Sequence, residues 1–237
     1  MDQIQIINRL SPNRSKGRQG QIPDIIVCHI TEGAFPGSIN WVMNPQAAVS
    51  YHFMVSRAGT IYQCVDIRDT AWANGTDNAG GSRDNRHSRL AVVRNRGINA
   101  NLYTISIGHE GRYSQNKGAL TFEQYKATVS LINQIRGEIS SIWGMEIPLT
   151  RNNIVGHACI TPRHRPNCPG PLFPFDEIID HLQAQEHKPA SWAEEAWQWA
   201  RSELQMDGTR PQDNITRQEV MVLLHRFYKS QQDKVLS

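Results

Sequence analysis

The chain has 237 residues, of which 39% are hydrophobic and 20% are charged, and its formal net charge at pH 7 is +3. This length allows one sizeable domain and a small second one, and the composition is that of an ordinary globular protein. The small positive charge does not predict nucleic acid as a partner. The sequence contains no run of about 18 apolar residues, so we expect no membrane span.

The first residues, 1–5, lack a basic flank followed by an apolar core, so the sequence predicts no secretory signal and a protein made in the cytoplasm. Its four cysteines are too few for a disulfide scaffold of this length. We expect three of them, Cys28, Cys64 and Cys159, to be small buried apolar residues.

Four segments have the patterns of β-strands. Residues 22–31 carry a β-branched run between a proline and a glycine-containing loop, which is typical of a buried central strand with His29 near its carboxyl end. Residues 51–56 and 60–65 flank a short turn with a glycine and predict a hairpin. Residues 102–108 predict a further strand.

Two helices follow in the chain. The sequence from Thr121 to Gln124 fits a capping box, and apolar residues then recur at helical spacing, with Val129 and Ile132 among them. Residues 175–182 form a second apolar helix. Strands that alternate with helices indicate an α/β domain.

Residues 73–101 are rich in Gly, Asn, Asp, Ser and Arg and lack periodicity, so we expect a loop that rims a cleft. Residues 183–190 are polar and reach a proline, which is typical of a linker. We therefore divide the chain into a domain over 1–182, this linker, and a small module over 191–237.

The module over residues 191–237 contains two expected helices, each beginning at a capping-box sequence, at Ser191 and at Thr216. Two helices bury little surface alone. We expect the module to pack on the main domain or on other copies of itself.

Three residues form a candidate metal site: His29, His157 and Cys168. Each histidine ends a β-branched run, and the cysteine lies in a proline-rich loop where a thiolate has no packing role. Two imidazoles and a thiolate suit zinc and leave a fourth position for water, which could attack an amide carbonyl near neutral pH. If the three residues meet in space, the sequence predicts a metal hydrolase.

The motifs around these residues occur in the order of a known family. The matching stretches are residues 25–33, 50–63, 69–72, 103–111, 154–157 and 167–170. They resemble the zinc-dependent N-acetylmuramoyl-L-alanine amidases, which include phage endolysins and the peptidoglycan recognition proteins. The resemblance implies a central mixed β-sheet flanked by helices, and hydrolysis of the amide between N-acetylmuramic acid and the L-alanine of the peptidoglycan stem peptide.

The resemblance also implies roles for individual residues. His29, His157 and Cys168 match the zinc ligands. Tyr51 matches a tyrosine beside the metal that can donate a hydrogen bond to the oxyanion. We expect Trp72 and Asn74, at the start of the long loop, to contact glycan or peptide.

Two positions depart from the family. Relatives with the pattern Ser-Ile-Glu-His-Glu-Gly use the first glutamate as general base, and this chain has Gly108 there, by natural divergence or by an engineered change. Glu110 shares the face of position 108 in a regular strand, so it is a candidate for proton transfer or a structural residue. Pro166 replaces a lysine or threonine that stabilises the oxyanion. Arg163, His164 or Arg165 could supply charge from the same loop, and we expect Arg165 to contact substrate.

These departures leave two readings open. The first is an amidase, and the second is a peptidoglycan-binding protein with an amidase fold and little turnover. A zinc hydrolase that acts on anhydromuropeptides inside the cell is a further alternative, which the appended module disfavours.

Within the module, Trp192-Ala193 with Ala196, then Asp207-Gly208, then residues 215–219 resemble part of a surface-layer-homology repeat. The resemblance implies that Arg217 binds acidic secondary cell-wall polymers. A wall module and no signal peptide fit a phage endolysin of a Gram-positive host, which acts on the wall after release through a holin. The alternative for residues 191–237 is a packing or oligomerisation appendage.

Overall fold

The computed structural model describes the chain except for residues 1–5, 77–83, 187, 190, 204–216 and 236–237. The chain divides into two compact units, Met1–Asp180 and His181–Ser237. Among the helices of the described residues, none combines the length and the apolar character that a membrane crossing requires.

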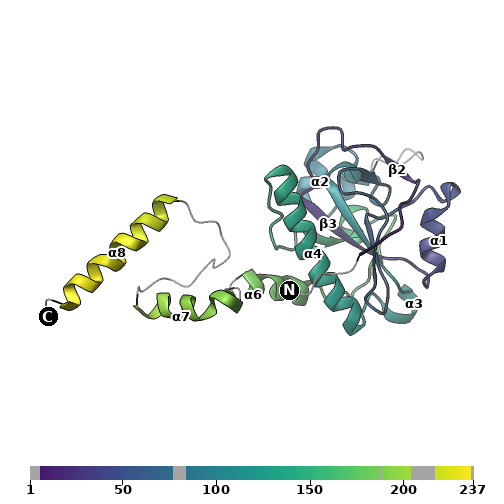
Figure 1. The fold of residues 1–237 in the computed structure, drawn as a ribbon. Helices are drawn as coiled ribbons and strands as arrows, with labels where there is room; N and C mark the ends of the chain where they lie inside the picture. The colour runs from purple at the N-terminus through teal and green to yellow at the C-terminus, as the bar shows by residue number, and fades with distance from the viewer. Residues whose placement is uncertain (1–5, 77–83, 187, 190, 204–216, 236–237) are drawn as a thin grey trace. The chain divides into compact units, whose positions relative to one another are not determined.

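The first unit is built on a six-stranded sheet with the order β1-β5-β4-β7-β3-β8 (Figure 1). Its strands are β1 (Ile6–Asn8), β3 (Ile25–Ile30), β4 (Phe53–Val55), β5 (Ile61–Gln63), β7 (Thr104–His109) and β8 (Ile154–Gly156). The β4–β5 hairpin of this sheet is antiparallel, and its other four pairs are parallel. The prediction of an α/β domain with a mixed central sheet is confirmed.

Strand β3 lies between β7 and β8, and all six of its residues are buried. The β-branched run that predicted a central strand is therefore buried on both faces, as parallel sheets require. The register sets His29 beside Gly108 of β7 and Cys28 beside Gly156 of β8. His29 thus reaches the carboxyl edge of the sheet, where ligands commonly bind.

Helices flank the sheet in the first unit. They are α1 (Gly37–Met43), α2 (Ala91–Arg96), α3 (Tyr113–Asn116), α4 (Phe122–Trp143), α5 (His157–Ile160) and the first part of α6 (Phe175–Glu186). The capping box of α4 is present as predicted: the Thr121 side chain accepts a hydrogen bond from Gln124 N–H, and the Gln124 side chain accepts one from Thr121 N–H. Gly144 ends α4 in the left-handed conformation that favours glycine.

The long segment over 73–101 is more structured than its composition indicates. Besides α2, it contains 3₁₀ turns at Asp84–His87 and Ala100–Tyr103. Nothing in the sequence pattern indicated α1, which has seven residues. Such short helices depend on tertiary packing, so periodicity alone does not reveal them.

Helix α6 extends to Glu186, so the first residues of the expected linker, 183–186, are helical instead. Their sequence, Gln-Ala-Gln-Glu, consists of good helix formers, and polarity at the end of a helix is compatible with an exposed last turn.

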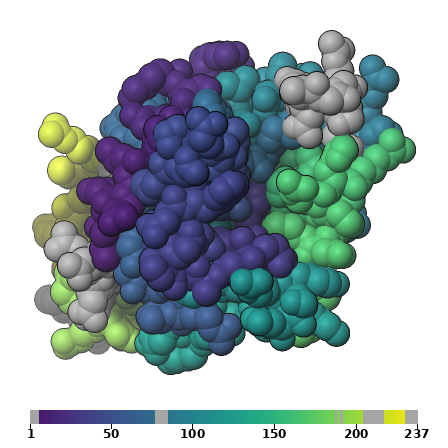
Figure 2. All heavy atoms as spheres, turned by 90° about the vertical axis from the view of Figure 1, so that its right-hand side faces the viewer, coloured from purple at the N-terminus to yellow at the C-terminus, as the bar shows by residue number. Residues whose placement is uncertain are grey.

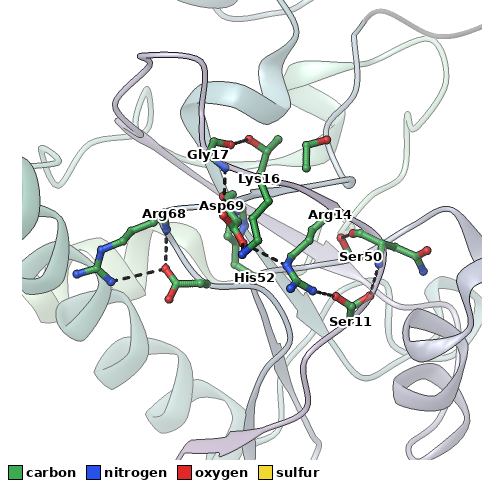
Figure 3. A network of polar contacts seen from close by, with 12 residues as sticks. Ser11, Arg14, Lys16, Gly17, Ser50, His52, Arg68 and Asp69 are labelled. Carbon is green, nitrogen blue, oxygen red and sulfur yellow. Dashed lines mark hydrogen bonds and ion pairs between the residues drawn. The ribbon is translucent and has the colours of Figure 1, made fainter.

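Residues 11–18 run beside the short strand β6 (Thr70–Ala71) and are tied to it by polar contacts (Figure 3). Strand β2 (Arg14–Ser15) pairs with β6, and Asp69 accepts hydrogen bonds from the side chains of Arg14 and Lys16 and from Gly17 N–H. Partial burial alone would raise the pKa of Asp69, but these donors outweigh it and lower the pKa. The N-terminal segment therefore anchors the start of the loop that carries Trp72.

The second unit contains α7 (Glu194–Glu203), preceded by a 3₁₀ turn at Ser191–Ala193, and α8 (Arg217–Val235). The Trp199 and Phe227 rings meet edge to face with centroids 5.6 Å apart, which links the two helices. Large apolar side chains nevertheless remain exposed, with Trp192 at 89% and Met221 at 64%. Thr216, where the second capping box was expected, lies outside the described residues.

Candidate active site

A pocket of about 1150 Å³ opens at the carboxyl edge of β3. Its walls come from residues 29–34, from α1, from the segment around Trp72 and from residues 161–168. Figure 2 shows the hollow on this face, with the blue segment that contains α1 on one side and the green segment of residues 161–168 on the other. Segments far apart in the sequence thus converge on one site.

His29, His157 and Cys168 lie together in this pocket, as their motifs predicted. One donor atom from each lies within 4.8 Å of the others, and Cys168 Sγ is 3.9 Å from His29 Nδ1. A tetrahedral zinc ion with these ligands needs separations of about 3.5 Å, so a small inward movement completes the geometry. The three residues fit zinc as ligands and leave a fourth position toward the pocket.

Burial keeps both histidines neutral. It lowers the pKa of His29 well below its ordinary value, and the neighbouring His157 adds to this effect. Burial also lowers the pKa of His157 to about 3, with a smaller contribution from the charge of Arg165. Neutral imidazole is the form that binds a metal, so both ligands are ready at neutral pH.

Cys168 behaves differently, because burial raises the pKa of its thiol to about 11. The backbone N–H of Ile30, 3.5 Å from Sγ, and the charge of Arg165 oppose this shift only in part. Without a metal the thiol therefore holds its proton at neutral pH, and a bound cation must displace it.

Tyr51 lies beside the metal ligands and over Gly108. Its ring meets the His29 ring edge to face, with centroids 5.1 Å apart. A Cβ atom at Gly108 would lie only 3.0 Å from Tyr51 Cδ2, so the glycine leaves the space that the ring fills. Burial raises the pKa of Tyr51 above its ordinary value, and the phenol therefore remains a hydrogen-bond donor.

Of the two alternatives for Glu110, the contacts of its carboxylate support the structural one. One carboxylate oxygen accepts a hydrogen bond from Phe35 N–H at 2.9 Å, and the other accepts one from Arg57 N–H at 2.7 Å. Glu110 follows the last residue of β7, so the alternation that would have placed it beside position 108 no longer applies. It joins two loops and does not line the pocket.

Of the three residues expected to contact substrate, two line the pocket and one does not. Trp72 and Arg165 line the pocket, and Arg165 is exposed there. Trp72 is held by a hydrogen bond from its indole Nε1 to Ser15 Oγ. Asn74 is fully buried and does not line the pocket, which corrects its expected contact with substrate.

Sequence reasoning missed two pocket residues, Glu32 and Trp41. Glu32 follows β3 with a left-handed backbone (φ 54°), and its charge raises the pKa of both Tyr51 and Cys168. Its place just beyond the His29 strand was a usable signal, because polar residues at that edge tend to meet. Trp41 of α1 is 56% exposed at the pocket, but nothing in its local sequence set it apart.

The comparison with known families decides the assignment. The family Amidase_2, N-acetylmuramoyl-L-alanine amidase, matches residues 19–171, which include all three metal-site residues and Tyr51. The chain belongs to this amidase family.

Two curated relatives of this amidase agree with that result. It is 27% identical over 175 residues to N-acetylmuramoyl-L-alanine amidase A of Achromobacter lyticus, covering 69% of this chain and 85% of the relative. It is 28% identical over 138 residues to the 1,6-anhydro-N-acetylmuramyl-L-alanine amidase AmpD of Haemophilus influenzae, covering 58% of this chain and 61% of the relative.

Solved structures confirm the fold. A selenomethionine derivative of AmpD superposes with a TM-score of 0.51 at 23% identity, covering 75% of this chain and 93% of that one. A mutant of PlyL gives a TM-score of 0.52 at 18% identity, covering 76% of this chain and 99% of that one. At these identities the likeness shows the shared architecture of sheet and helices.

The proton on Cys168 predicts how metal affinity depends on pH. Because the thiol must lose one proton and both histidines are already neutral, the apparent zinc association constant should rise about tenfold per pH unit between about pH 6 and 8. Chelator-competition titrations at several pH values, corrected for zinc hydrolysis, measure this slope. In the matched variant Cys168→Asp the ligand is already ionised, so the slope should vanish. A slope that persists in this variant would mean that another group releases the proton.

Proposed function

We propose that this amidase binds zinc through His29, His157 and Cys168 and hydrolyses the amide between N-acetylmuramic acid and L-alanine in peptidoglycan. The observation that carries the proposal is the convergence of two neutral imidazoles and one thiol at the edge of an open pocket. When bound, zinc supplies a Lewis acid that favours attack of water on an amide carbonyl.

The other residues of the pocket have complementary tasks. The Tyr51 phenol keeps its proton and lies against His29, where it can donate a hydrogen bond to the carbonyl oxygen as negative charge develops. Arg165 presents an exposed guanidinium that suits the carboxylates of a stem peptide. Trp41 and Trp72 offer flat apolar surfaces of the kind on which a sugar ring or peptide packs.

Proton transfer is the weak point of this site. Gly108 offers no carboxylate, Glu110 is engaged by two backbone amides, and Glu32 is the one carboxylate among the described residues that line the pocket. A positioned general base typically contributes about 10²–10⁴-fold to the rate, so we expect slow turnover. The alternative is a protein that binds peptidoglycan in the same pocket without useful turnover.

Digestion of purified cell walls separates these two functions. The zinc-loaded protein should release free stem peptides, identified by mass, and removal of zinc by a chelator should abolish release because the Lewis acid is lost. The variant Cys168→Ser, tested beside the wild type, should lose both zinc and activity. Walls left intact by fully loaded protein at high concentration would leave binding as the function.

Position 108 offers a direct test of the missing base. Gly108→Glu should raise the rate of amide hydrolysis by about 10²-fold or more once the Tyr51 ring moves aside, since the Cβ alone would lie 3.0 Å from Tyr51 Cδ2. Gly108→Gln introduces a side chain of similar size that cannot act as a general base, so it should not raise the rate. Single-turnover rates on a soluble muropeptide decide the matter, and an equal gain in both variants would refute a role as base.

We further propose that residues 191–237 hold the enzyme on acidic wall polymers, with Arg217 as the contact. Arg217 is exposed in the first turn of α8 and is available to a solvent-borne ligand. This module supports the role of a phage endolysin of a Gram-positive host, made in the cytoplasm and released through a holin. The exposed apolar residues of α7 and α8 support the alternative of self-association.

Removal of single positive charges from α8 tests the role of this module. Arg217→Gln should weaken co-sedimentation with walls that retain their acidic polymers several-fold, since one charge-assisted contact is lost. Lys229→Gln removes an exposed positive charge from the same helix and should have little effect. Equal losses in the two variants would indicate non-specific attraction, and sedimentation equilibrium of the wild type reports self-association directly.

A further inference from the structure

Among the described residues, several buried polar atoms lack a hydrogen-bond partner at ordinary distance, and two of them bear on the His29 ring. These two are Nε2 of His29 and Oδ1 of Asn74. Both residues are buried, with exposed fractions of 1% and 0%. A buried polar atom without a partner costs about 1–3 kcal/mol, so two such atoms near one catalytic ligand call for an explanation.

The amide of Asn74 has only one orientation that satisfies its neighbours. Its Nδ2 lies 2.9 Å from Thr104 Oγ1 and 2.8 Å from Ser106 Oγ. The Thr104 hydroxyl already donates its proton to the carbonyl of Ala100 at 2.7 Å, so toward Asn74 it can only accept. The nitrogen of the amide must therefore face Thr104 and Ser106, which leaves Oδ1 as an acceptor on the other side.

The backbone of Asn74 is fixed as well. Its N–H and that of Ala73 both donate to Oδ1 of Asn101. Thr104 and Ser106 lie on the same face of β7 as Gly108, which pairs with His29. The Asn74 side chain is thus attached to the strand next to His29, on the face that carries the imidazole.

The imidazole of His29 needs an acceptor at its inner nitrogen. Its Nδ1 faces Cys168 Sγ at 3.9 Å, so Nδ1 is the atom available to a metal. A neutral imidazole carries one proton, and a metal-binding Nδ1 requires that proton on Nε2. This N–H is buried, and no atom of the described residues lies at hydrogen-bond distance from it.

We propose that Asn74 is a positioning residue. Its Oδ1 accepts a hydrogen bond from the Nε2–H of His29 and so holds the imidazole in the tautomer whose Nδ1 faces the metal. The metal ligands of proteins usually have such outer partners, which fix the tautomer and orientation of the ring. A hydrogen bond donated by the His29 ring to Asn74 would also oppose the lowering of the His29 pKa by burial. The inference rests on the proposed zinc site.

The tautomer of His29 is measured first, in the ¹⁵N-labelled protein without metal. Long-range ¹H–¹⁵N correlation should show the proton on Nε2 in the wild type. Asn74→Leu removes the acceptor at similar size, so it should give a mixture of tautomers and weaken zinc binding by about 10–100-fold in chelator competition. A wild type with the proton on Nδ1, or a Leu variant unchanged in both readouts, overturns the proposal.

Two further variants separate positioning from folding of the loop. Asn74→Asp restores an acceptor for His29 but cannot donate to Thr104 and Ser106. It should therefore recover most of the zinc affinity lost in Asn74→Leu, while its Tm stays below that of the wild type. Thr76→Val removes the hydroxyl that bonds Ile98 and Ala100 in the same loop, and it should leave zinc affinity near the wild type. Equal loss in Thr76→Val and Asn74→Leu would assign the effect to the loop and refute positioning. If the wild type binds no zinc, the proposed zinc site is refuted. The tautomer of His29, measured without metal, still tests the role of Asn74.

Discussion

The parallel pairing of β3 with β7 on one side and β8 on the other is the constraint on which the site depends. It sets His29 beside Gly108, and it ends β8 at Gly156 so that His157 follows at the same edge. A slip of one residue would turn His29 to the opposite face of the sheet. Every residue of β3 and β7 is buried, so water does not compete for the ladder hydrogen bonds that hold this register. Backbone pairing therefore creates the geometry of the ligands.

The same register explains why Gly108 and Tyr51 belong together. A side chain at position 108 would project beside His29 into the space that the Tyr51 ring now fills. The chain thus has an aromatic wall and a hydrogen-bond donor where relatives with a glutamate have a proton acceptor. Under the proposed function, the pocket offers ligands for a metal and a donor for an oxyanion, while Glu32 is the one carboxylate among the described lining residues that could move the proton of water. Binding and turnover therefore depend on different residues of one pocket.

The strands, the hairpin and α4 were predictable because each has a local pattern: a β-branched run, a turn with glycine, and a capping box with helical periodicity. The convergence of His29, His157 and Cys168 was predictable because their motifs are specific. Glu110 was not, because alternation holds only within a strand and β7 ends at His109. Asn74 was not, because its burial depends on Thr104 and Ser106, about thirty residues further along the chain. The sequence could not show where side chains outside helices and strands point.

The loop that carries Trp72 and Asn74 is held at both ends, and the two anchors differ in kind. On one side, Lys16 reaches Asp69 with an 80% exposed side chain, so solvent screens this ion pair and it contributes little. The Gly17 N–H donates to the same carboxylate without any loss of side-chain entropy, and Arg14 is better shielded, at 27% exposed. On the other side, Asn101 holds two consecutive backbone N–H groups. Since a backbone N–H donates at each anchor, the loop should keep its position at salt concentrations that screen the surface charges, and the wall of the pocket with it.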